Sequence, residues 1–92
     1  MNFDSFPGGA IVRRGMNDVA SGVITDEALL VMVGAPRLRA LGLDIPPETF
    51  VDPERALYER LSASGADSAH SRYNALIRLL VSFERSFRSG IR

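Results

Sequence analysis

The pattern of apolar and polar positions predicts a helical chain, and the pattern is clearest in the C-terminal quarter. Between residues 69 and 87 apolar side chains recur at gaps of 4, 3, 4, 3 and 4 residues. An average spacing of about 3.5 residues keeps such side chains on one face of a helix. We name this face the seam, and its members are Ala69, Tyr73, Leu76, Leu80, Phe83 and Phe87. We expect the helix to cover about residues 67–88.

Capping signals predict shorter helices in the middle of the chain. Thr25 suits an N-cap, and a helix spanning residues 26–33 would place the two acidic residues after Thr25 at its positive N-terminal end, where they are stabilising. This segment is apolar all round, which indicates burial at the centre of a bundle. A buried strand is the competing interpretation, because Val31 and Val33 are β-branched. Pro36 then suits the first turn of a second short helix, which we expect to end near Leu41.

The remaining signals complete an all-α prediction. Asp52 and Pro53 mark the start of a helix that we expect to end near Ala63. Pro7 and its neighbouring glycines interrupt regular structure, so residues 1–15 are expected to be a flexible N-terminal arm. Residues 16–92 then form a single helical domain, within which 16–22 make one helical turn. The predicted fold is a small bundle of four or five helices with a long C-terminal helix.

Composition restricts the classes of partner and location. The 92 residues are enough for one domain, and 46% hydrophobic with 24% charged residues is typical of a globular chain. Eleven basic residues, all arginine, balance eleven acidic ones, so the chain as a whole does not attract nucleic acid or anionic lipid. The chain has no cysteine, which excludes disulfides and thiolate chemistry and favours the cytoplasm. The longest apolar run, residues 28–35, is far shorter than the ~20 residues of a membrane span.

The long C-terminal helix is also the main candidate for function. One interpretation is that the seam only packs on the shorter helices. The other is that those helices are too short to cover it, so that Phe83, Phe87 and Ile91 stay exposed and pair with another chain. We therefore predict a symmetric homodimer whose interface residues are Tyr73, Leu76, Leu80, Phe83, Phe87 and Ile91.

Arginines opposite the seam suggest an alternative function. Arg78, Arg85 and Arg92 recur every seven residues, which fits either a solvated face or a contact with an anionic partner. Residues 26–42 resemble a degenerate helix-turn-helix, in which Gly34 takes the turn position and two arginines open the second helix. The fit is poor, because Gly42 and Pro46 truncate that helix. The candidate anion-contacting residues are Arg37, Arg39, Arg78, Arg85 and Arg88.

No residue pattern predicts catalysis, and we expect the chain not to be an enzyme. His70 is the only histidine, and a lone histidine on a helix is far more often a surface side chain than a catalyst or a metal ligand. Asp52 and Glu54 are explained by helix capping, and the glycines lack the lysine and the strand-to-helix context of a phosphate loop. We therefore predict no catalytic residue, no cofactor and no metal ligand.

The sequence favours a non-catalytic interaction protein in the cytoplasm, of the adaptor, inhibitor or regulatory-subunit class. It would act through protein–protein contacts of its C-terminal helix. Its predicted partners are a second copy of itself and an unidentified protein, with nucleic acid less favoured and no membrane. The alternative function is a small DNA-binding transcriptional regulator with a degenerate helix-turn-helix at 26–42.

Overall fold

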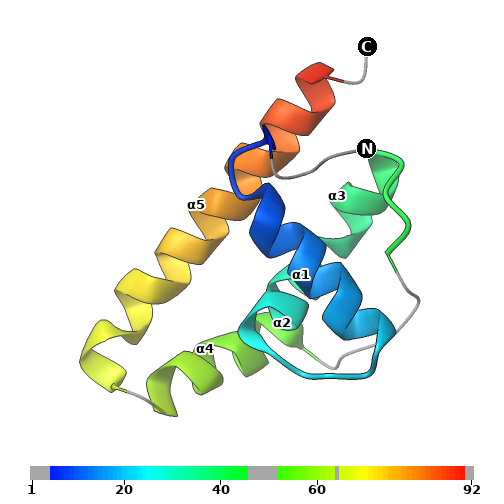
Figure 1. Ribbon diagram of the computed structural model, residues 1–92. Helices are drawn as coiled ribbons and strands as arrows, with labels where there is room; N and C mark the ends of the chain where they lie inside the picture. The colour runs from blue at the N-terminus through cyan, green and yellow to red at the C-terminus, as the bar shows by residue number, and fades with distance from the viewer. Residues whose placement is uncertain (1–4, 46–51, 64, 91–92) are drawn as a thin grey trace.

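The computed structural model describes residues 5–45, 52–63 and 65–90, and this part of the chain forms five helices and no strand (Figure 1). The helices are α1 (Gly9–Ala20), α2 (Asp26–Val33), α3 (Ala35–Ala40), α4 (Pro53–Ala63) and α5 (Ala66–Gly90). At a rise of ~1.5 Å per residue, α5 alone accounts for most of the 41 Å length of the molecule. The predicted small all-α bundle with a long C-terminal helix is confirmed.

Helix α2 occupies the centre of the bundle. It packs against α1, α3, α4 and α5, and its residues 28–31 are almost completely buried. A helix with apolar side chains all round is stable only when neighbours cover every side. The central position predicted for this segment is confirmed, and the alternative interpretation as a buried strand is wrong.

Two predicted helix starts are formed by the side chains that the sequence indicated. Thr25 Oγ1 accepts a hydrogen bond from the backbone N–H of Ala28 at 3.1 Å and donates one to the Asp18 carboxylate at 2.6 Å. Thr25 therefore both caps α2 and ties its start to α1. Asp52 Oδ1 accepts a hydrogen bond from the Arg55 N–H at 3.3 Å, immediately before α4.

Helix α1 corrects the predicted N-terminal arm. Residues 9–15, expected to be flexible, form the first part of α1, and residues 16–20 continue it instead of making an isolated turn. Glycine lowers helix propensity, which is why the sequence argued against a helix here. In the structure Gly15 lies where α1 meets α2, and a Cβ there would overlap the Glu27 carbonyl and the Val31 side chain. Close packing against α2 stabilises the helix despite its glycines.

The segment before α1 folds back onto the C-terminal half of α5, as Figure 1 shows. The Phe6 ring lies edge-on to the rings of Phe83 and Phe87, with centroid distances of 6.0 and 5.5 Å. Gly8 has a φ of 74°, and an added Cβ would lie 2.7 Å from the Leu79 carbonyl oxygen. Only glycine combines this backbone conformation with so close an approach. The N-terminal segment thereby covers the aromatic part of α5.

A partly buried ion pair joins α3 to α5. Glu84 is 6% exposed, and it is the one charged residue buried in the described part of the chain. Arg37 Nε donates to both carboxylate oxygens of Glu84, at 3.0 and 2.9 Å. A buried carboxylate is stable only when such partners replace its hydration. The pair therefore fixes α3 against the long helix.

Candidate protein–protein interface

The structure corrects the exposure predicted for the seam, while the predicted interface itself stays a prediction. Leu80, Phe83 and Phe87 are 0, 0 and 2% exposed, so the expectation that the phenylalanines remain uncovered is wrong. Tyr73 and Leu76 are half-buried against the same core, and Ile91 lies outside the described residues.

The physical reason is that the seam is covered by more than the short helices. Phe6 packs on the two phenylalanine rings, and a Cβ at Gly34 would lie 2.9 Å from a methyl group of Leu80. These contacts come from segments far from α5 in sequence. Side chains with no accessible surface cannot contact a partner, so a charged substitution at Phe83 would test folding rather than docking.

Four large apolar residues remain exposed in the described part of the chain, and two of them are adjacent. Val23 and Ile24 are 48% and 58% exposed in the turn that precedes α2, and the others are Tyr58 and Leu79. Ile24 immediately precedes the Thr25 cap, a position from which an apolar side chain usually packs on the following helix turn. Such packing would explain why part of Ile24 is covered, but it does not explain why 58% of the residue is exposed. We name these two residues the Val23–Ile24 tip.

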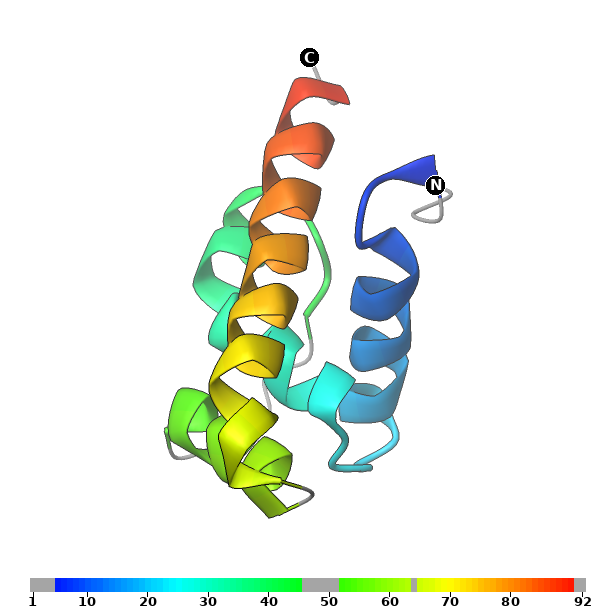
Figure 2. The same cartoon turned by 90° about the vertical axis from the view of Figure 1, so that its left-hand side faces the viewer.

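A pocket of about 280 Å³ opens where the starts of α2 and α5 meet the end of α4. Figure 2 shows these three helices meeting at the end of the molecule opposite the last turns of α5. Its apolar lining comes from α4 and α5, and its charged rim comes from α2 and α5. The lining residues are Asp26, Glu27, Leu61, Arg72, Ala75 and Leu76. Together with the Val23–Ile24 tip, these six residues make up what we call the α2–α5 face.

Ion pairing sets the rim of this pocket. Arg60 of α4 donates from Nε to the Asp26 carboxylate at 2.9 Å, which holds the start of α2 against α4. Glu27 and Arg72 lie on the same rim with opposite charges, and Leu61 forms the most buried part of the lining. The pocket lining therefore combines apolar side chains with charges of both signs.

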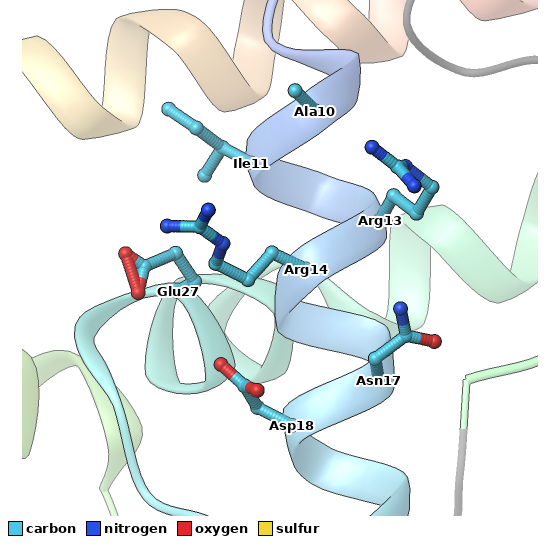
Figure 3. A pocket seen from close by; sticks show the side chains of 7 residues that line it. All are labelled: Ala10, Ile11, Arg13, Arg14, Asn17, Asp18 and Glu27. Atoms are coloured by element: carbon cyan, nitrogen blue, oxygen red, sulfur yellow. The ribbon is translucent and has the colours of Figure 1, made fainter.

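A second pocket of about 430 Å³ runs along the outer side of α1 (Figure 3). In Figure 3 the side chains of Arg14 and Glu27 point toward each other, and Glu27 lines both pockets. The lining residues are Ala10, Ile11, Arg13, Arg14, Asn17, Asp18 and Glu27. Two arginines and two carboxylates leave this pocket without net charge, so its charge does not select an anion or a cation.

Two of the candidate anion-contacting arginines make contacts within the chain. The Arg37 guanidinium pairs with Glu84, and Arg39 Nε donates to the Ile45 carbonyl oxygen at 3.3 Å. The other three lie at exposed positions of α5, and they are Arg78, Arg85 and Arg88. Because Arg37 pairs with Glu84, one of the two arginines with which α3 would contact DNA as a recognition helix is already neutralised.

The geometry of α2 and α3 differs from that of a helix-turn-helix. Such motifs join their helices by a turn of three or four residues, whereas Gly34 alone separates α2 from α3. Helix α3 has only six residues, the same length as the expected segment 36–41, which is short for a helix that contacts bases. DNA binding by residues 26–42 stays a prediction, and neither the length of the turn nor the length of α3 supports it.

Tyr58 and Tyr73 form an aromatic contact between α4 and α5, with ring centroids 5.7 Å apart. Burial of the Tyr73 phenol raises its pKa above the usual value of 10.0, and the negative charges of Glu54 and Asp52 raise it further. The phenol therefore stays neutral at physiological pH. Its place in the structure is that of a packing residue between two helices.

The single histidine lies on the exposed surface of α5. Its Nε2 is 3.2 Å from the side-chain nitrogen of Asn74, one helical turn further on. Across the residues that the structure describes, no three His, Asp or Glu side chains are grouped closely enough to hold a metal ion. None of the helices in the described segments has the length and apolar character needed to cross a bilayer.

The sequence did not identify the Val23–Ile24 tip or the burial of Glu84. A pair of adjacent β-branched residues next to an N-cap was the available signal for the tip, but it also fits ordinary packing. Glu84 lies between Leu80 and Phe87 at helical spacing, which places it toward the core. Its partner is 47 residues away, and no local pattern connects the two.

Comparison of the chain with protein-family models, curated proteins and solved structures finds no match.

Proposed function

We propose that this chain is a non-catalytic interaction protein that forms a homodimer and acts as an adaptor, an inhibitor or a regulatory subunit. Its contacts are made by the α2–α5 face, which includes Leu76 of the seam, rather than by the buried aromatic part of the seam. The start of α5 thus contributes to the interface through Arg72, Ala75 and Leu76, while its aromatic half belongs to the core. We further propose that it acts in the cytoplasm, because a chain without cysteine suits a reducing compartment.

The observation that carries the proposal is the Val23–Ile24 tip. Four large apolar residues are exposed in the part of the chain that the structure describes, and two of them are neighbours in one turn. Exposed apolar residues that are gathered in one place are typical of interaction sites, whereas isolated ones are not. The nearby pocket adds apolar and charged lining residues, a combination that protein interfaces share.

The oligomeric state tests this proposal. Sedimentation equilibrium over a series of protein concentrations should give a mass approaching twice the 10.0 kDa of one chain. The reason is that self-association removes the α2–α5 face from water. A mass of one chain at every concentration, up to the high micromolar range, would contradict the homodimer.

A further inference from the structure

We propose that Ile24 of one copy inserts into the pocket lined by Leu61, Ala75 and Leu76 of a second copy, and that the second copy returns the same contact. This inference rests on the proposed homodimer and specifies its geometry. The occupant of the pocket is thus a second copy of this chain.

The first argument is the complementarity of a protruding residue and a pocket on one face. Ile24 is 58% exposed, and Asp26, two residues later, is already on the rim of the pocket. Because the two features are neighbours, a two-fold axis between them brings each Ile24 to the pocket of the other copy. A contact of this kind is closed, since residue i meets residue j while j meets i. The pocket volume of about 280 Å³ accommodates the branched side chain of isoleucine.

The second argument is the charge of the rim. Glu27 lies on the α2 side and Arg72 on the α5 side. The same two-fold axis exchanges these sides, so that Arg72 of one copy approaches Glu27 of the other. A rim of a single sign would repel its own copy, whereas a rim with both signs is complementary to itself. The charges therefore favour a second copy and set the orientation in which it binds.

A weak, specific dimer needs only a small part of the accessible surface of the chain. Such interfaces bury about 1,000 Å² in total, or about 500 Å² from each copy. That is roughly a tenth of the 5576 Å² accessible surface of the chain. Leu61 is buried, so the accessible surface of the α2–α5 face comes from its other seven residues. We therefore expect a dimer in the micromolar range rather than an obligate one.

Disulfide trapping between two different variants tests the contact directly, because the natural chain has no cysteine. The Ile24→Cys and Ala75→Cys variants are mixed and oxidised, and the products are separated by non-reducing electrophoresis. Mass spectrometry of the disulfide-linked peptides then identifies which two cysteines are joined, because both variants have nearly the same mass. Since a disulfide forms only when Cα atoms are within about 7 Å, we expect a crosslinked dimer joining the two variants. Mixing Ile24→Cys with Ala40→Cys is the matched control, because Ala40 is an exposed helical alanine on α3. That mixture should remain largely uncrosslinked.

Charged substitutions provide an independent readout. Ile24→Arg and Ala75→Arg should each weaken the dimer at least tenfold in sedimentation equilibrium, and Ala40→Arg should leave it unchanged. Both substituted positions are exposed, so circular dichroism should show that the variants stay folded. If the natural chain dimerises while the paired variants do not crosslink and Ile24→Arg still dimerises, this contact is wrong but the homodimer stands. If the natural chain is a monomer throughout, the homodimer fails as well.

Discussion

Replacing Phe83 with alanine is expected to lower the free energy of unfolding by about 3–5 kcal/mol. The ring is 0% exposed and is stacked on Phe87 with centroids 5.4 Å apart, with Phe6 packed against its edge. Its removal leaves a cavity that these neighbours fill only in part. A domain of this size is stabilised by about 5–15 kcal/mol, so the variant loses a large share of its stability.

Urea unfolding followed by circular dichroism measures this loss. Leu79→Ala is the matched control, because Leu79 lies on the same helix but is 37% exposed. We expect the control to change the free energy of unfolding by less than about 1 kcal/mol. Equal effects of the two substitutions would show that Phe83 lies on the surface, as an interface residue would.

Gly15→Ala is the second substitution with a large expected effect, and its sign decides between two arguments. Helix propensity alone predicts that alanine stabilises α1 by about 1 kcal/mol relative to glycine. The structure predicts the opposite, because the new Cβ would overlap the Glu27 carbonyl and the Val31 side chain. Overpacking of this kind costs about 1–3 kcal/mol. We expect net destabilisation, because one of the two obstructing groups is backbone and cannot turn away.

Asn17→Ala on the same helix is the control for Gly15→Ala. Asn17 is exposed, so this substitution should leave the midpoint of thermal unfolding nearly unchanged or slightly raised. Thermal unfolding of both variants and of the natural chain provides the comparison. A higher midpoint for Gly15→Ala than for the natural chain would mean that α1 and α2 are not in close contact at this position.

The parts of the fold that the sequence predicts are those determined by neighbouring residues. The Thr25 cap, the Asp52 and Pro53 helix start and the burial of α2 each depend on side chains within one or two helical turns. The extent of α1 was missed because its glycines read as helix breakers. The role of Gly15 is to allow the close contact with α2, which only the tertiary structure defines.

The candidate site was predictable only in its location on α5. Periodicity identified the apolar side of that helix, but it does not say which segment covers the side. The answer came from Phe6, at the other end of the chain, which removes Phe83 and Phe87 from solvent. The sequence does not predict the exposure of the tip at Ile24 either, because exposure depends on how α1, α2 and α4 pack around the turn.

Amide chemical shifts measured by NMR over a dilution series test the central claim most directly, since they report which residues change environment on self-association. We predict concentration-dependent shifts clustered at residues 23–27 and 72–76, with residues 80–87 unchanged from the micromolar to the millimolar range. Shifts clustered at 80–87 would place the interface on the seam and contradict the account. Spectra identical at all concentrations would contradict self-association altogether.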